Sequence, residues 1–203
     1  MVKMTSKEAR GPFILVTLLV FLWGFAYGLL NALNAHFQAV INITPGKAVA
    51  LHGAYFAAYF LGPILFGYRV FERFGFKITF ITGLCIYSAG ALMFWPSAVL
   101  TSFAGFWIST FTVALGLSTL EVAANPFIAL CGPPEHGETR LNLAQAFQGF
   151  GAVLSSLMAT FALFKGLNDA SSLVDAQWTY LAVALFVAFI AMVFYYYPLP
   201  EAS

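Results

Sequence analysis

Long apolar stretches, separated by short segments of polar and turn-forming residues, run through the whole chain. A helix that crosses a bilayer needs about 20 mainly apolar residues. Six stretches have this length, and they cover residues 12–38, 47–71, 78–96, 102–130, 141–165 and 176–198. The breaks between them contain turn-forming or charged residues, as in Asn42-Ile-Thr-Pro-Gly-Lys47 and Trp95-Pro96-Ser97. The pattern therefore predicts six membrane-spanning helices, and Pro63 and Pro126 are expected to bend two of them.

The composition agrees with a protein that is embedded in lipid. The chain is 61% hydrophobic and 8% charged, whereas soluble domains carry about 25% charged residues. We therefore expect an all-α polytopic membrane protein with an N-terminal tail (1–11), a six-helix bundle (12–198) and a C-terminal tail (199–203). The net charge of +1 indicates nothing about partners, but the lack of a basic cluster argues against nucleic-acid binding. Cys85 and Cys131 form no metal motif or disulfide framework, so we expect no metal or other cofactor.

Lysine and arginine are distributed unevenly over the predicted loops, which indicates an orientation. With an even number of spans, both termini lie on one side of the membrane. Seven of the nine basic residues fall on that side, and such an excess marks the cytoplasm. These seven are Lys3, Lys7, Arg10, Arg69, Arg73, Lys77 and Arg140, against Lys47 and Lys165 on the other side. We therefore expect an integral protein of the plasma membrane with both termini in the cytoplasm.

Glu121 is the one acidic residue that the predicted spans place at membrane depth. It lies ten residues before Cys131, which corresponds to a depth of about 15 Å in a helix. Carboxylates inside a membrane are costly, and they typically line a polar pathway or carry protons. We therefore expect Glu121 to be buried and to accept a proton, with protons as the coupling ion of a transport process. The alternative is a structural carboxyl group that is hydrogen-bonded between helices.

Polar side chains follow one another at helical spacing on three of the predicted spans. Helix 1 carries Tyr27, Asn31, Asn34 and Gln38; helix 4 carries Ser118, Glu121 and Asn125; helix 5 carries Asn142, Gln145 and Gln148. Such stripes predict a polar cavity, because amides that face lipid find no hydrogen-bond partner. At the rise of an α-helix, Glu121 and Gln148 lie at a similar depth from the cytoplasmic surface of the membrane, whereas Asn31 lies nearer the outer opening of the predicted cavity. Amides both donate and accept, which suits sugar hydroxyls. The expected sugar-binding residues are Tyr27, Asn31, Asn34, Asn125, Gln145 and Gln148.

Small residues at helical spacing indicate where helices pack closely. On helix 2 they form the pairs Gly53-x-x-x-Ala57 and Ala58-x-x-x-Gly62. On helix 5 they include Ala144, Gly149, Gly151, Ala152, Ser155, Ser156 and Ala159. Small side chains let two helices approach each other in lipid, so we expect both sets to be packing faces.

Several of these segments resemble one known family. Phe21-Leu-Trp-Gly-Phe-Ala-Tyr-Gly-Leu-Leu-Asn-Ala-Leu-Asn-Ala-His-Phe-Gln38 resembles helix 1 of the L-fucose permease group of the major facilitator superfamily. Leu120-Glu-Val-Ala-Ala-Asn-Pro-Phe127 and Arg140-Leu-Asn-Leu-Ala-Gln-Ala-Phe-Gln148 resemble helices 4 and 5 of the same group. The segments Phe80-Ile-Thr-Gly-Leu-Cys-Ile-Tyr87 and Phe94-Trp-Pro96 are also similar to this group, and their sequence is closest to fungal members. The segment Glu72-Arg-Phe-Gly-Phe-Lys77 is loosely similar to the superfamily's loop between helices 2 and 3, with Glu72, Arg73, Gly75 and Lys77 at the motif positions.

The resemblance implies a sugar:proton symporter of twelve helices in two six-helix halves. It assigns Glu121 as the protonatable carboxylate of helix 4, and Gln145 and Gln148 as sugar-facing residues of helix 5. Asn31 departs from the family pattern, because it stands where the family has an essential aspartate. An amide cannot take up a proton, so this departure puts the coupling of transport to protons in doubt.

Two functions of different classes fit the sequence. The first is a monosaccharide transporter for L-fucose or a related hexose, in which this six-helix chain pairs with a second copy or with a missing C-terminal half. The second is a non-transporting remnant or a sugar-binding partner subunit in the membrane. An enzyme is not expected: Ser118 lacks the flanking glycine of a serine nucleophile turn, and no histidine is placed as its base.

Overall fold

Six long helices account for most of the chain in the computed structural model, which describes residues 4–5, 9–41, 44–163, 171–197 and 199. The helices are α1 (Arg10–Ile41), α2 (Pro45–Gly62), α3 (Tyr68–Val99), α4 (Phe103–Leu130), α5 (Gly137–Leu163) and α6 (Ser171–Tyr196). A π-helical turn, η1 (Pro63–Gly67), joins α2 to α3, and a 3₁₀ turn, η2 (Pro134–His136), precedes α5. The all-α fold class is confirmed, and the described residues contain six long α-helices, as many as the predicted spans.

Two of the predicted breaks differ from the structure. The helix α3 passes through Pro96 and ends at Val99, so the turn follows at 100–102, where Thr101 has a positive φ of 46°. A proline removes one backbone N–H and need not end a helix when only a few residues remain. The predicted loop at 69–77 is also helical apart from Gly75, because η1 leads directly into α3.

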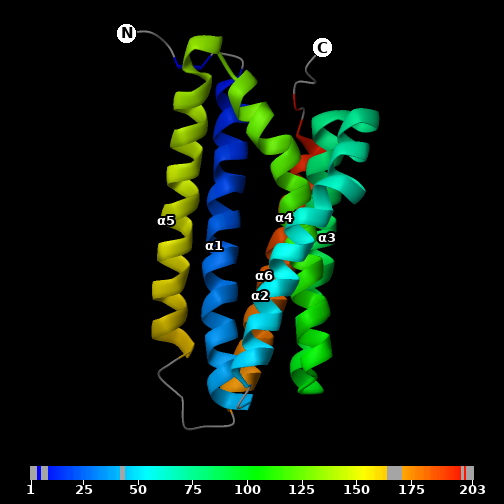
Figure 1. Cartoon of the computed structure of the whole chain (residues 1–203). Helices are drawn as coiled ribbons and strands as arrows, with labels where there is room; N and C mark the ends of the chain where they lie inside the picture. The colour runs from blue at the N-terminus through cyan, green and yellow to red at the C-terminus, as the bar shows by residue number, and fades with distance from the viewer. Residues whose placement is uncertain (1–3, 6–8, 42–43, 164–170, 198, 200–203) are drawn as a thin grey trace.

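Gly75 provides the reversal between the second and third crossings. Its φ of 72° and ψ of −166° interrupt α3, and this backbone conformation is open to glycine but strained for other residues. The stretch Gly46–Val99 is apolar over 54 residues and helical except at Gly75, which gives a length along the chain of about 80 Å. A bilayer core is about 30 Å thick, so this stretch crosses it twice, with Gly75 near the turn. Arg10–Leu29, Phe103–Leu130 and Gln177–Tyr196 are likewise long and apolar enough to cross, and α5 runs alongside α1 (Figure 1).

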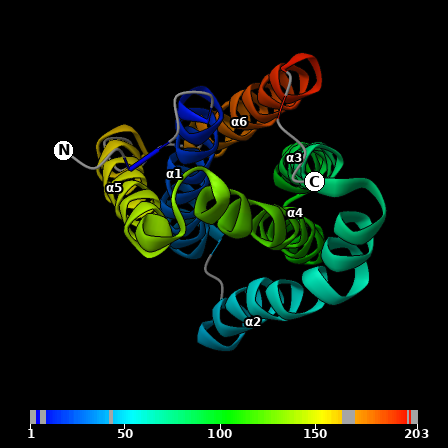
Figure 2. The ribbon, with the colours of Figure 1, turned by 90° about the horizontal axis from the view of Figure 1, so that it is seen from above.

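The helices form two groups around a centre made by α1 and α4. Figure 2 shows α5 beside α1 on one side, and α2 and α3 beside α4 on the other, with α6 next to α3 and α1. The chain runs up and down, so α1 begins and α6 ends at the same end of the bundle (Figure 1). This end also holds the Gly75 turn and the connection from α4 to α5. The side of the membrane to which it corresponds stays a prediction.

Glycine brings the backbones of neighbouring helices into direct contact. A Cβ atom added at Gly24 of α1 would clash with the carbonyl oxygen of Gln148 of α5, and one at Gly28 would clash with Ala152. In the same way, a Cβ at Gly90 of α3 would lie 2.6 Å from the backbone nitrogen of Val113 of α4. The glycines of α1 are therefore essential for the close packing of α1 on α5, as expected for small-x-x-x-small pairs.

The predicted packing faces are confirmed in part. On α5, Ala144, Gly151, Ser155 and Ala159 are buried, whereas Gly149 is exposed. On α2, Ala58 and Gly62 are buried, and Gly62 lies directly against Ser118 of α4. The expectation for Gly53 and Ala57 was wrong within the described chain: both are exposed, and no described atom lies within 4 Å of a Cβ added at Gly53. They occupy a face of α2 that points away from α4.

We expect Gly24→Ala to destabilise the bundle by about 1–3 kcal/mol, because the added methyl group forces α1 and α5 apart. Gly53→Ala is the matched control, since it makes the same change in helix propensity where space is open. Unfolding of both variants by denaturing detergent, followed by circular dichroism, gives the two free energies. Equal stabilities of the two variants would contradict the contact between α1 and α5.

Candidate sugar and proton site

A side-chain amide pair joins α4 to α5 near the end where these helices are connected. Gln145 donates a hydrogen bond from Nε2 to Oδ1 of Asn125, at 3.3 Å. Asn125 lies in the last two turns of α4 and Gln145 in the third turn of α5, so the short connection through η2 brings them together. Both side chains are half-buried. Two of the predicted sugar-binding residues thus meet in the structure.

Glu121 lies one helical turn before Asn125 on the same face of α4. It is half-buried, and among the described residues no lysine, arginine or histidine lies within ion-pair distance of it. Tyr55 and Tyr59 of α2 are close enough to interact electrostatically with it. The carboxyl group therefore lies on α4 within electrostatic range of two tyrosines of α2, and no described residue pairs it with a cation.

An aromatic cluster of α1 and α2 borders this carboxyl group. The rings of Tyr55 and Tyr59 are stacked, with centroids 5.1 Å apart. Tyr27 of α1 lies 5.4 Å from Tyr55, and Trp23 of α1 lies 6.4 Å from Tyr59. Trp23 is buried, whereas Tyr27 is exposed at its edge. The cluster thus joins α1 to α2 and presents aromatic faces next to Glu121.

Sequence reasoning named Tyr27 but missed Tyr55 and Tyr59. The available signal was spacing: Trp23 and Tyr27 are four residues apart, as are Tyr55 and Tyr59. Residues at this spacing share one face of a helix. A contact between the aromatic face of helix 1 and the aromatic face of helix 2 could therefore have been predicted.

Other residues of the predicted stripes take different positions. Asn31 is half-buried on α1, one turn beyond Tyr27, and Asn142 is exposed at the start of α5. The side chains of Asn34 and Gln38 lie outside the described part of the structure. Gln148 is half-buried, and its backbone contacts Gly24. Ser118 is buried and donates to the carbonyl oxygen of Leu115 at 3.1 Å, so it is a packing residue of α4.

The predicted loop motif surrounds the Gly75 turn. Glu72 and Arg73 are exposed, and Lys77 places its ammonium group 6.0 Å from the ring centroid of Tyr195 on α6. Phe76, next to the turn, packs edge-to-face on Phe127 of α4 at 5.2 Å. Because Phe127 follows Asn125 by two residues, the turn is connected by direct packing to the helix that carries the polar site.

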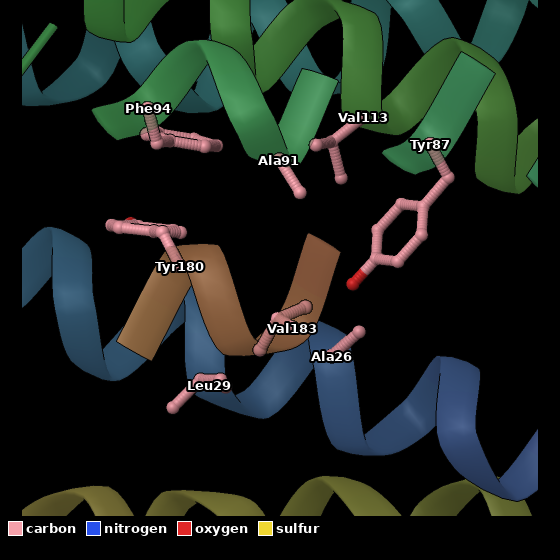
Figure 3. A pocket seen from close by; sticks show the side chains of 8 residues that line it. All are labelled: Ala26, Leu29, Tyr87, Ala91, Phe94, Val113, Tyr180 and Val183. Atoms are coloured by element: carbon pink, nitrogen blue, oxygen red, sulfur yellow. The ribbon is translucent and has the colours of Figure 1, made fainter. Parts of the chain in front are cut away.

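Two pockets among the described residues lie elsewhere and are lined mainly by apolar side chains. The one in Figure 3 has a volume of about 20 Å³ and lies between α1, α3, α4 and α6. A cavity of about 300 Å³ between α1, α5 and α6 is lined by apolar side chains such as Phe21, Phe25 and Phe186, together with Tyr87. Neither includes a residue of the polar stripes. The amide pair, Glu121 and the tyrosine cluster instead belong to the side of the bundle formed by α1, α2, α4 and α5.

Comparison with known proteins places this arrangement in a family. The model of the Major Facilitator Superfamily matches residues 15–203. The L-fucose-proton symporter of Escherichia coli K12 is 40% identical over 150 residues, which are 74% of this chain and 34% of the symporter. A glucose/galactose transporter of Brucella abortus is 30% identical over 195 residues, which are 94% of this chain and 47% of that protein.

The fold of a solved relative is also shared. The crystal structure of the E. coli fucose:proton symporter superposes with a TM-score of 0.83 at 29% identity, and the match covers 96% of this chain and 51% of that one. The chain thus spans about a third to a half of the length of the relatives it matches. The resemblance that the sequence motifs indicated is confirmed, while the closeness to fungal members stays a prediction. The chain is an integral membrane protein, and it belongs to the fucose permease-like family of the major facilitator superfamily.

Proposed function

We propose that this chain forms one six-helix half of a transporter that moves a monosaccharide together with protons across the plasma membrane. The observation that carries the proposal is the amide pair of Asn125 and Gln145 one turn from Glu121, a half-buried carboxyl group without a described cationic partner. L-fucose, glucose and galactose are the candidate substrates, because proteins named for their transport are similar to this chain.

The amide pair keeps hydrogen-bonding capacity for a sugar. After Gln145 has donated to Asn125, the Oε1 atom of Gln145 and the NH₂ group of Asn125 can still accept and donate. Adjacent hydroxyl groups of a sugar ring present the complementary pattern. Tyr27 and Tyr55 supply an aromatic surface for the apolar face of the ring. Asn31, Asn34 and Gln148 complete the proposed set of sugar-binding residues.

Glu121 is the proposed proton carrier. A carboxyl group at membrane depth without a cationic partner is stable when neutral, and it can release its proton when the path opens to water. Asn31 cannot share this role, because an amide does not ionise. One carboxyl group in this half therefore carries the proposed coupling to protons.

The side formed by α1, α2, α4 and α5 is the proposed contact with a second half. Transporters of this superfamily alternate by rocking two halves about a central site, and the relatives are about twice as long as this chain. The second half is a C-terminal segment or a second copy of the chain. The excess of lysine and arginine on one side of the predicted spans supports a cytoplasmic position for both termini.

A sugar-binding subunit without transport activity is the second candidate. Asn31 favours it, because this residue stands where the family resemblance implies an aspartate. Uptake measurements decide between the two, since a binding subunit binds sugar without moving it.

We expect Glu121→Gln to leave sugar binding largely intact and to abolish accumulation of sugar against its gradient, because glutamine mimics the protonated carboxyl group. The measurement is uptake of labelled L-fucose, glucose or galactose by proteoliposomes that contain the chain and a second half, with an inward proton gradient. Accumulation by the glutamine variant would contradict the role of Glu121, and no uptake by the unchanged protein would favour the binding subunit.

We expect Gln145→Ala to weaken sugar binding by about 1–3 kcal/mol, because a buried amide and a sugar hydroxyl both lose a partner. Gln177→Ala is the matched control, since it removes an amide from α6 on the opposite side of the bundle. Calorimetry in detergent gives both affinities. Equal affinities for the two variants would assign Gln145 to packing of α4 on α5.

We expect the isolated 203-residue chain to self-associate in liposomes, because polar groups left against hydrocarbon cost several kcal/mol each. Ala57→Leu on the exposed face of α2 should reduce the cross-linked dimer, whereas Ala182→Leu on α6 should not. A strictly monomeric chain that transports sugar would overturn the assignment of this chain as one half of a transporter.

A further inference from the structure

We propose that Arg140 is a positioning residue. It connects the end of α4 to the start of α5 by hydrogen bonds to backbone carbonyl groups, and so keeps the side chains of Asn125 and Gln145 within hydrogen-bond distance. Its effect on sugar rests on the proposed function, whereas the fastening of the two helices does not.

The guanidinium group of Arg140 is fully buried, with 0% of the residue exposed. Its Nε donates to the carbonyl oxygen of Ile128 at 3.1 Å, and its Nη1 donates to Met4 at 2.7 Å and Pro133 at 3.1 Å. Its Nη2 donates to Gly132 at 3.2 Å and to Ala129. A guanidinium group has five N–H donors, and here five carbonyl oxygens receive them.

The charge of Arg140 is balanced by the end of α4. A buried charge is costly unless it is paired or hydrogen-bonded, and no described carboxylate lies within ion-pair distance of this one. Ile128 and Ala129 belong to the last turn of α4, whose carbonyl groups carry the negative end of the helix dipole, and the carbonyl oxygen of Ile128 also accepts from the backbone N–H of Cys131 at 3.3 Å. Arg140 satisfies these carbonyl groups from the first turn of α5, so it is a bridge between two helices as well as a positive charge.

This bridge lies a short distance from the amide pair. Asn125 precedes Ile128 by three residues, and Gln145 follows Arg140 by five. Figure 1 shows that α4 and α5 meet at the end where they are connected and diverge away from it, since α5 packs along α1. The distance between Asn125 and Gln145 therefore depends on how the two helix ends are held, and Arg140 holds them.

Residues 4–5 lie against the same bridge. Met4 accepts a hydrogen bond from Arg140, and a Cβ atom added at Gly132 would lie 2.6 Å from the carbonyl oxygen of Met4 and 3.0 Å from the Cα of Thr5. Glycine at 132 thus allows residues 4–5 to lie against the connection and keep water from the guanidinium group.

The first experiment measures the two helix ends directly, without sugar. Spin labels replace Leu130 and Leu143, which are exposed near the end of α4 and the start of α5, and their distance distribution is recorded in liposomes. Arg140→Lys should broaden or shift the distribution, because lysine is a point charge with three donors and cannot reach five carbonyl groups. Arg69→Lys, at an exposed position of α3, is the control and should leave it unchanged. An unchanged distribution in Arg140→Lys would overturn the proposal.

A second variant covers the case in which Arg140→Lys does not fold. Gly132→Ala keeps the arginine but displaces Met4 and crowds Nη1, which would lie 2.9 Å from the new methyl group. It should broaden the same distribution to a smaller extent, and a distribution identical to that of the unchanged protein would overturn the proposal.

The second experiment tests whether Arg140 acts on sugar through Gln145. Arg140→Lys should weaken sugar binding by about tenfold, and the loss should largely disappear when Gln145 is already alanine, because residues that act as a unit are not additive. Additive losses would overturn the link between Arg140 and the site. If the unchanged protein, assembled with its second half, binds no sugar, the proposed function fails, and the distance measurement alone decides whether Arg140 joins the helices.

Discussion

A polar atom at membrane depth must find its partner inside the protein, because hydrocarbon offers none. Several serine and threonine hydroxyl groups in this bundle meet that constraint locally, although Thr17 and Thr110 are buried without a hydrogen-bond partner among the described residues. Ser97, Ser109, Thr112 and Thr119 each donate to the carbonyl oxygen four residues earlier. Ser88 of α3 instead donates to Ala184 of α6 at 2.9 Å, and so joins two helices. The side chains with capacity left over, above all Glu121 and the amide pair, stand out for this reason.

Close contact between helix backbones is the second requirement for a stable bundle in the membrane. In lipid, helices gain little by hiding apolar side chains, so they associate through packing. Gly24 and Gly28 let α1 lie directly on α5, while Gly90 and Gly116 do the same for α3 and α4. The two groups of helices that result place the aromatic pairs of α1 and α2 beside the carboxyl group of α4.

The sequence predicted the helices well and their partners less well. Apolar length alone was enough for six spans, since the bilayer fixes how long a crossing helix must be. The cost of an intramembrane carboxylate singled out Glu121 in the same way. Gly53 and Ala57 were misread because helical spacing shows that two residues share a face, but not what lies opposite that face. The buried position of Arg140 was not predicted, and the residue entered the orientation only as one of the positive charges. Its partners are backbone carbonyl groups, which every residue has, so the pattern of side chains does not indicate them.

The π-helical turn at Pro63–Gly67 sets the direction of the segment that follows it. A π turn holds about one residue more than an α turn, because its hydrogen bonds run from residue i to i+5, so it has the geometry of one extra residue in a helix. Every residue beyond such an insertion is rotated by about 100°. In this chain the rotated stretch includes Gly67, which lies against Val122 of α4, and leads to the reversal at Gly75. Removal of one residue between 63 and 67 would therefore rotate the helical segment that follows about its axis, although the apolar character of the segment would hardly change.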